Sequence, residues 1–170
     1  MSFSKLNKFI CKPIENDGRS LIRKPIILTS SKGFYLRNNL DILNDYGVNA
    51  DIICKAGARF ADYYPWLQRN LANKVKCHDK IVLYVWLGTC DLTVKTGKFI
   101  NLRHHSNELA NQYVTTHINK YIHFISQFES VKLVLVEIPP YSIVEWNRVK
   151  GHSNPEYFSE QDSVLRERIL

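Results

Sequence analysis

Three loops carry residue types that can perform acyl chemistry. Each follows a short apolar segment: Thr29-Ser30-Ser31 follows residues 25–28, Gly57 follows residues 50–53, and Gly88-Thr89-Cys90-Asp91 ends the run 81–87. A serine at the end of a strand can attack an ester carbonyl, and backbone N–H groups beside it can hold the negative charge that develops on the carbonyl oxygen. The loops are therefore candidates for one catalytic site, provided that the fold brings them together.

The segments around these loops alternate between strand and helix patterns. We expect strands at residues 25–28, 50–53, 81–87 and 131–136, and helices at residues 34–46, 60–72, 107–128 and from about Ser159 onward. Four strand-then-helix units predict a parallel sheet covered on both faces, and the nearly continuous apolar runs 81–87 and 131–136 favour strands buried on both sides. The carboxyl ends of parallel strands meet at one edge of a sheet, so the three loops should lie together there.

Two of the helices have specific sequence signals. Residues 107–128 place one apolar stripe toward the sheet, formed by Leu109, Tyr113, Ile118, Tyr121, Ile122 and Ile125. The last helix has Ser159 as a candidate N-cap and Asp162 in its first turn. Its pattern is still helical at Leu170, so we expect the domain to be incomplete at its C-terminal end.

In chain order, the three loops resemble the first three sequence blocks of the SGNH (GDSL-type) hydrolases and esterases, which read Gly-Asp-Ser, a lone Gly, and Gly-x-Asn-Asp. The resemblance covers roughly residues 25–170. The segments GARFADYYPWL, WLGTCDLT and EIPPYSIVEWNRV are similar to SGNH-like open reading frames of invertebrate mobile elements. The resemblance implies an α/β fold of the flavodoxin-like type, a three-layer α/β/α sandwich with a mainly parallel sheet. It also implies an acyl-ester substrate and no cofactor.

The same resemblance suggests roles for individual residues. Ser31 takes the nucleophile position, Gly57 supplies an oxyanion-hole N–H, and Cys90 replaces the oxyanion-hole Asn of the family. A thiol is a weak hydrogen-bond donor, so this replacement alone is expected to cost about 10²–10³ in rate. Substrate contacts are assigned to four neighbouring residues: Arg59, Gly88, Thr89 and Asp91.

Each main candidate also has a purely structural interpretation. Ser31 can cap the helix that follows it, and Gly57 can be an ordinary turn glycine. Asp91 can orient its loop by accepting hydrogen bonds from backbone N–H groups. Arg59 can hold an anionic group of a ligand or can form a surface salt bridge.

The general base is the main departure from the family. A serine hydroxyl needs a base to take its proton, and the family supplies a histidine from an Asp-x-x-His block that does not occur in these 170 residues. The six histidines of the chain do not occupy the place of that block in the sequence: His78, His104, His105, His117, His123 and His152. Either the sequence is a fragment or its site is incomplete. The alternative function is a catalytically inactive SGNH-like module that binds nucleic acid or a protein partner.

The chain divides into a basic arm at residues 1–24 and the SGNH-like domain at residues 25–170. The formal net charge is +7, and much of the excess lies in the arm at Lys5, Lys8, Lys12, Arg19, Arg23 and Lys24. The arm can be a solvated extension, or it can bind the phosphates of nucleic acid or acidic lipids. No base-reading motif accompanies it.

Several other classes of protein are disfavoured. The longest uncharged apolar run, residues 81–87, is much too short for a membrane span, which needs about 18 residues. The N-terminus lacks a secretory pattern, and the four cysteines have irregular spacings typical of a reduced compartment, so we expect an intracellular and specifically a cytoplasmic protein. The cysteine and histidine spacings match no common zinc pattern, and we expect no metal.

Overall fold

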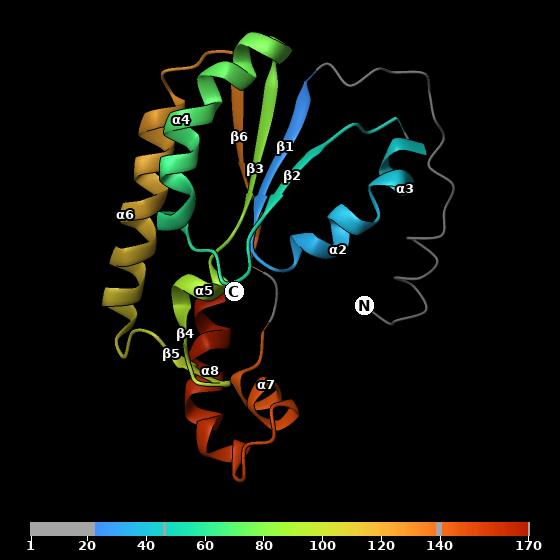
Figure 1. Cartoon of the computed structure of the whole chain (residues 1–170). Helices are drawn as coiled ribbons and strands as arrows, with labels where there is room; N and C mark the ends of the chain where they lie inside the picture. The colour runs from blue at the N-terminus through green and yellow to red at the C-terminus, as the bar shows by residue number, and fades with distance from the viewer. Residues whose placement is uncertain (1–22, 46, 139–140, 170) are drawn as a thin grey trace.

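A four-stranded parallel sheet forms the centre of the computed structural model, which describes residues 23–45, 47–138 and 141–169. The strand order is β2-β1-β3-β6. The bounds are β1 (Lys24–Thr29), β2 (Asp51–Cys54), β3 (Ile81–Trp86) and β6 (Val131–Leu135). The order of the parallel strands along the chain is thus 2-1-3-4, which agrees with flavodoxin-like sheets. The predicted fold class is confirmed: the chain is a mixed α/β protein with a parallel sheet flanked by helices (Figure 1).

One face of the sheet is covered by α4 (Phe60–His78) and α6 (Asn107–Ile125) (Figure 1). The buried positions of α4 recur at helical spacing: Phe60, Tyr63, Leu67 and Leu71. They pack against buried strand residues such as Leu28 and Leu83 in the main apolar core.

The apolar stripe of α6 differs from the one that the sequence predicts. The helix begins with a cap, because the Ser106 hydroxyl accepts the backbone N–H of Leu109. It buries Ala110, Tyr121 and Ile125, whereas Leu109 and Ile122 are about half exposed. The buried stripe is narrower than the predicted one because β6 is the edge strand of the four-stranded sheet. Only one side of α6 therefore contacts β6 and α4.

The predicted helix at residues 34–46 is broken into two short ones, α2 (Gly33–Asn38) and α3 (Leu40–Asp45). Asn39 interrupts them, since its side-chain amide donates to the carbonyl oxygen of Tyr35 and its backbone leaves the helical region. Tyr46 lies outside the described residues.

Gly33 allows α2 to begin directly against the sheet. A Cβ at this position would lie 2.0 Å from Cγ2 of Thr29 and 2.9 Å from Cβ of Cys54. Only glycine therefore permits the chain to turn from β1 into α2 this close to β2.

A second apolar core lies beyond the carboxyl ends of the strands (Figure 1). It is formed by α5 (Thr89–Leu92), the antiparallel hairpin of β4 (Thr93–Thr96) and β5 (Phe99–Leu102), α7 (Ile143–Val149), the 3₁₀ helix η1 (Pro155–Phe158) and α8 (Ser159–Ile169). Its fully buried residues include Ile143 and Leu165. The sequence patterns predicted no element at the hairpin or at α7.

The last helix begins where the sequence predicts, but its packing does not follow the fourth strand-then-helix unit. The main contacts of α8 are with α7, η1 and β5. Among its described side chains Leu165 is buried and most of the others are polar, so α8 suits a small core better than a broad sheet face. Ser159 is also not an N-cap, since its hydroxyl donates to the carbonyl oxygen of Glu156.

Two residues of the predicted basic arm, Arg23 and Lys24, are bonded to the folded domain. Lys24, which the charge pattern assigns to the arm, is the first residue of β1 and forms an ion pair of 3.0 Å with Asp51. Arg23 donates from Nη1 to the carbonyl oxygen of Ser130 at 2.7 Å. Both residues thus belong to the folded domain, and the rest of the arm, residues 1–22, lies outside the described residues.

Candidate functional site

A cavity of about 580 Å³ lies at the carboxyl edge of the sheet. The loops that follow β1, β2 and β3 form one side of it, and the β4–β5 hairpin with residues Tyr141 and Trp146 forms the other. The position is the switch point of the 2-1-3-4 order, where open α/β sheets bind their ligands. Its volume is in the range of small-molecule sites, about 300–1,000 Å³.

Ser31 lines this cavity at the turn between β1 and α2. The structure does not give Ser31 the capping role, because the N-cap residue of α2 is Lys32 and no side chain caps that helix. The turn is held by backbone bonds instead: the carbonyl oxygens of Ser30 and Ser31 accept from Gly33 and Phe34. The Ser31 residue is exposed, so a ligand in the cavity can reach it.

The two loop glycines have different surroundings. Gly57 lines the cavity with φ +70°, a left-handed conformation that favours glycine, and a Cβ added there would have no atom within 4 Å among the described residues other than its chain neighbours. Gly88 has φ +117°, and a Cβ there would lie 2.3 Å from Cδ1 of Ile138. Gly88 is thus packed behind the wall and does not line the cavity, whereas Thr89 and Cys90 do.

Asp91 faces away from the cavity. Its side chain is fully buried, and its carboxylate oxygens accept the backbone N–H of Phe60 at 3.2 and 3.4 Å. Burial raises the pKa of this carboxyl group to about 7. The carboxylate joins the loop after β3 to the start of α4, which corresponds to the orienting role rather than to substrate contact.

Cys90 presents a half-buried thiol to the cavity. Burial and then the nearby Asp91 raise the pKa of this thiol. At neutral pH the thiol is therefore protonated, which makes it a poor nucleophile and a weak donor. Arg103 fixes the backbone here by donating from Nη2 to the Cys90 carbonyl oxygen at 3.2 Å.

Lys32 is a site residue that the sequence patterns did not indicate. Its Nζ donates to Oγ1 of Thr89 at 2.9 Å and lies 5.4 Å from the ring centre of Tyr141. Burial lowers the pKa of the Lys32 amine. Its position beside Ser31 was a signal that could have identified it, whereas nothing in the sequence indicated that Tyr141 or Trp146 would reach this cavity.

The lining is strongly cationic. Arg59 forms both a cavity wall and an ion pair, with its Nε 3.5 Å from Oδ2 of Asp62, so the two interpretations of this residue are compatible. Five cationic residues line the cavity against one acidic residue, Asp62: Lys32, Lys55, Arg59, Lys95 and Arg103. The field in the cavity therefore favours an anionic group.

No described histidine lines the cavity. His104 and His117 contact the ring of Tyr113, and His152 contacts Phe99 and Phe158 at the second core. Within the described residues, no group of three His, Cys, Asp or Glu residues is arranged to hold a metal ion.

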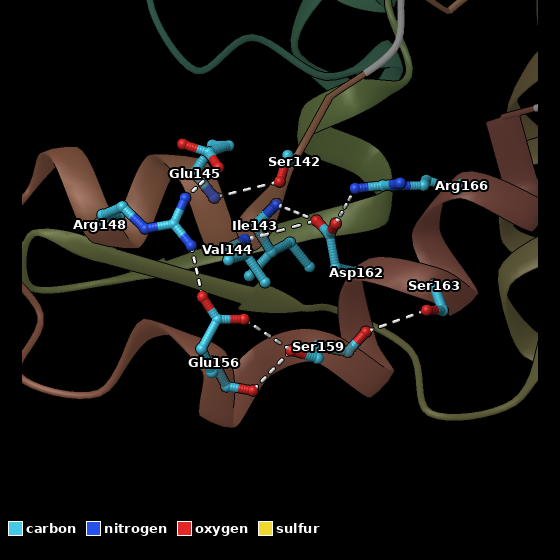
Figure 2. Close-up of polar contacts among 10 residues, drawn as sticks. All are labelled: Ser142, Ile143, Val144, Glu145, Arg148, Glu156, Ser159, Asp162, Ser163 and Arg166. Atoms are coloured by element: carbon cyan, nitrogen blue, oxygen red, sulfur yellow. Dashed lines mark hydrogen bonds and ion pairs between the residues drawn. The ribbon is translucent and has the colours of Figure 1, made fainter.

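α7 is fixed in place by α8 (Figure 2). The buried carboxylate of Asp162 accepts the backbone N–H groups of Ile143 at 2.5 Å and Val144 at 3.4 Å, and it pairs with Arg166 at 2.7 Å. On the exposed side, Arg148 pairs with Glu145 and Glu156. Figure 2 shows these contacts around the start of the helix, and they set the position of Trp146 in the cavity wall.

Asn147 attaches the same helix to the hairpin. Its fully buried side-chain amide accepts the N–H of Ile100 and donates to the carbonyl oxygen of Ile100, both at 2.9 Å. The second core thus forms one wall of the cavity as a connected unit.

Two further features concern the described cysteines and helices. Cys54, Cys77 and Cys90 are free thiols. In the part of the chain that is described, none of the helices has the length and apolar character that crossing a bilayer requires.

Comparisons with known proteins are sparse. No protein-family model matches the chain, and no curated protein matches it. Among solved structures, the chain is similar to a protein from Streptococcus pneumonia that is described provisionally as a platelet activating factor, with a TM-score of 0.43 and 12% identity. The match covers 90% of this chain and 64% of that protein, so this chain spans slightly less than two thirds of its length.

Proposed function

We propose that the cavity is the substrate site of an acyl-ester hydrolase domain of the SGNH type. The observation that carries the proposal is that Ser31, Gly57 and Cys90 line one cavity although they come from three separate loops. These residues stand at the nucleophile, glycine and asparagine positions of the family. Because ligands bind at this edge of open parallel sheets, the position of the cavity supports the same proposal.

In the proposed reaction, Oγ of Ser31 forms a bond to the carbonyl carbon of the ester while its proton passes to a base. The backbone N–H groups of Ser31 and Gly57 hold the oxyanion. The ester C–O bond then breaks and the alcohol leaves with the proton. Attack by water on the acyl-serine releases the acid and restores Ser31.

We expect this chain to bind its ester more readily than it hydrolyses it. No described histidine lines the cavity to act as the base, and the protonated thiol of Cys90 replaces a stronger donor. The missing donor alone is expected to cost about 10²–10³ in rate. Little or no esterase activity should therefore be measurable without added base.

The test supplies the missing base from solution. Hydrolysis of p-nitrophenyl acetate is measured with increasing imidazole for the wild-type chain and for Ser31→Ala, and the Ser31→Ala rate is subtracted as background. We expect a difference that rises with imidazole and saturates, because the cavity is large enough to admit the free base together with the ester.

Ser153→Ala is the matched control, since Ser153 is an exposed serine outside the cavity. It should behave like the wild type. Equal rates for wild type and Ser31→Ala at every imidazole concentration would refute Ser31 as the nucleophile. A high wild-type rate without imidazole, abolished by Ser31→Ala, would show instead that the chain supplies its own base.

A second candidate is a module of the same descent that binds its ligand without turnover. The observation that favours it is the combination of a cationic lining with the absence of a described histidine there. Saturable ligand binding without an imidazole-dependent rate would support this candidate over the first.

A further inference from the structure

We propose that the ligand of this cavity carries an oxyanion group, a carboxylate or a phosphate, held by Lys32 and Arg103 beside Cys90. The inference rests on the proposed function only in taking the cavity as the functional site. It adds the substrate class, an acidic acyl compound, which the resemblance to esterases does not specify.

Among the described residues, three of the five cations that line the cavity have no ion pair: Lys32, Lys95 and Arg103. Lys55 and Arg59 are each within 3.5 Å of a carboxylate oxygen of Asp62, which offsets part of their charge. By contrast, Lys32 and Arg103 have no carboxylate within ion-pair distance in the part of the chain that is described. Lys95 is exposed to solvent, so Lys32 and Arg103 are the two partly buried cations of the lining that have no counter-ion among the described residues.

Lys32 is the more unusual of the two because it is half-buried. Within the part of the chain that is described, its Nζ donates to a neutral hydroxyl, that of Thr89, and lies over the face of the Tyr141 ring. Burying an ammonium group without a paired anion costs free energy, and the lowered pKa of Lys32 reflects that cost. An oxyanion bound beside Nζ would offset this free-energy cost.

Arg103 provides a second group of donors close to the same point. Its Nη2 donates to the Cys90 carbonyl oxygen, and its Nε is buried with no hydrogen-bond partner among the described residues. A guanidinium binds carboxylates and phosphates through two parallel hydrogen bonds, which a single carbonyl oxygen does not satisfy. Lys32 and Arg103 bond to two neighbouring residues, Thr89 and Cys90, which places both cations at that part of the wall.

Asp91 does not cancel this charge. Its carboxylate lies behind the wall, accepts the Phe60 N–H and is absent from the lining. Burial favours its neutral form, so at neutral pH it carries only part of a negative charge.

The rest of the cavity suits the uncharged part of such a ligand. Val94, Ile100, Tyr141 and Trp146 provide apolar surface in the lining. An acyl compound with one anionic end can thus place its charge near Lys32 and Arg103 and its carbon chain against this surface.

Equilibrium binding tests the inference without requiring turnover. Isothermal titration calorimetry is performed with monomethyl succinate, which has an ester and a carboxylate, with its neutral analogue dimethyl succinate, and with inorganic phosphate. We expect monomethyl succinate or phosphate to bind at least about tenfold more tightly than dimethyl succinate, a difference of about 1.4 kcal/mol. The tighter of the two anions identifies the oxyanion.

The variants Lys32→Met and Arg103→Met should each weaken the binding of the anion by about tenfold. Their affinity for dimethyl succinate should equal that of the wild type. Lys120→Met is the matched control, because Lys120 is an exposed lysine on α6 outside the cavity. Arg103→Lys keeps the charge at that site and should retain more affinity than Arg103→Met, which guards against misfolding as the cause.

Three results would overturn the inference: no heat of binding for either anion up to about 10 mM, equal affinity for the neutral diester, or anion affinity unchanged in both Met variants. Because binding is the readout, a chain that lacks esterase activity can still pass this test. The two proposals can thus fail separately.

Discussion

The Asp91 carboxylate accepts the backbone N–H of Phe60 at 3.2 Å, although the two residues are separated by 31 positions in the chain. This bond connects the end of β3 to the start of α4 inside the protein. It joins two of the three loops that line the cavity, the loops after β2 and β3, and its acceptor is a buried carboxyl group.

We predict that this buried acid makes stability depend on pH. The folded-state pKa of Asp91, about 7, lies above the ordinary value of 3.8, so the folded state binds more protons than the unfolded state between these values. The free energy of unfolding should therefore fall as pH rises from about 4 to 7. Asp91→Asn keeps an oxygen acceptor for the Phe60 N–H and should remove this dependence.

The measurement is urea denaturation of both proteins at pH 5 and pH 7.5. Between these values the wild type should lose about 1–3 kcal/mol relative to Asp91→Asn, since one pKa unit corresponds to about 1.4 kcal/mol. Asp51 and Asp62 do not interfere, because their lowered pKa values act below pH 4. Identical pH slopes for both proteins would contradict a raised pKa at Asp91.

The contact between α8 and α7 predicts an effect on stability far from the sheet. Asp162→Ala removes the acceptor for the Ile143 and Val144 N–H groups, which are buried. The free energy of unfolding should fall by about 1–3 kcal/mol, the usual cost of a buried donor left without a partner. Chemical denaturation monitored by circular dichroism measures the loss.

Two further variants separate the hydrogen bond from other effects. Asp162→Asn retains an acceptor oxygen and should lose less stability than Asp162→Ala. Glu145→Ala breaks an exposed ion pair on the same helix and should have little effect, because exposed pairs contribute little. An equal loss in Asp162→Asn and Asp162→Ala would indicate that the ion pair with Arg166 matters more than the N–H groups.

The loop glycines should respond differently to the same substitution. Gly57→Ala places a Cβ into open space at φ +70°, which costs about 1–2 kcal/mol for a left-handed conformation. Gly88→Ala has φ +117°, outside the ordinary left-handed region, and its Cβ would also meet Ile138. Thermal denaturation should show a larger loss for Gly88→Ala. A larger loss for Gly57→Ala would contradict the packing of Ile138 over Gly88.

The basic arm yields a prediction about nucleic acid. If the protein binds RNA or DNA through Lys5, Lys8, Lys12 and Arg19, affinity should be weakly sequence-selective and strongly salt-dependent. Deleting residues 1–22 should flatten the slope of log affinity against log salt by about 0.7–0.9 for each phosphate that the shortened chain no longer neutralises. The deletion retains Arg23 and Lys24, because both are bonded to the folded domain.

Fluorescence anisotropy with a labelled single-stranded oligonucleotide at several salt concentrations gives both slopes. Replacing the four basic residues with Gln serves as a control of equal length and should have the same effect as the deletion. Unchanged affinity and slope in the shortened chain would exclude the arm as the binding site, and no binding by the full chain at low salt would leave it a solvated extension.

The amino-acid sequence by itself determined the sheet and the meeting of the loops. Apolar runs such as residues 81–87 are long enough only for strands, and each is followed by small residues that end it. Since parallel strands share one carboxyl edge, the loops of Ser31, Gly57 and Gly88 were predicted to lie together. Ser31 and Gly57 line one cavity, but the third loop contributes Thr89 and Cys90 to it and not Gly88. The prediction needed only local patterns and the rule for parallel strands.

Tertiary structure decided the other wall and the charge of the cavity. Tyr141 and Trp146 reach it because Asp162 and Asn147 each hold α7 through two hydrogen bonds between distant segments, which leave no periodic trace in a sequence. Asp91 was a candidate for substrate contact, and only packing placed it behind the wall with its charge suppressed. Packing also distinguishes Lys32 from Lys24: both are partly buried, but Lys24 pairs with Asp51 whereas burial lowers the pKa of Lys32. The free energy of an ammonium group depends on whether water or a counter-ion surrounds it.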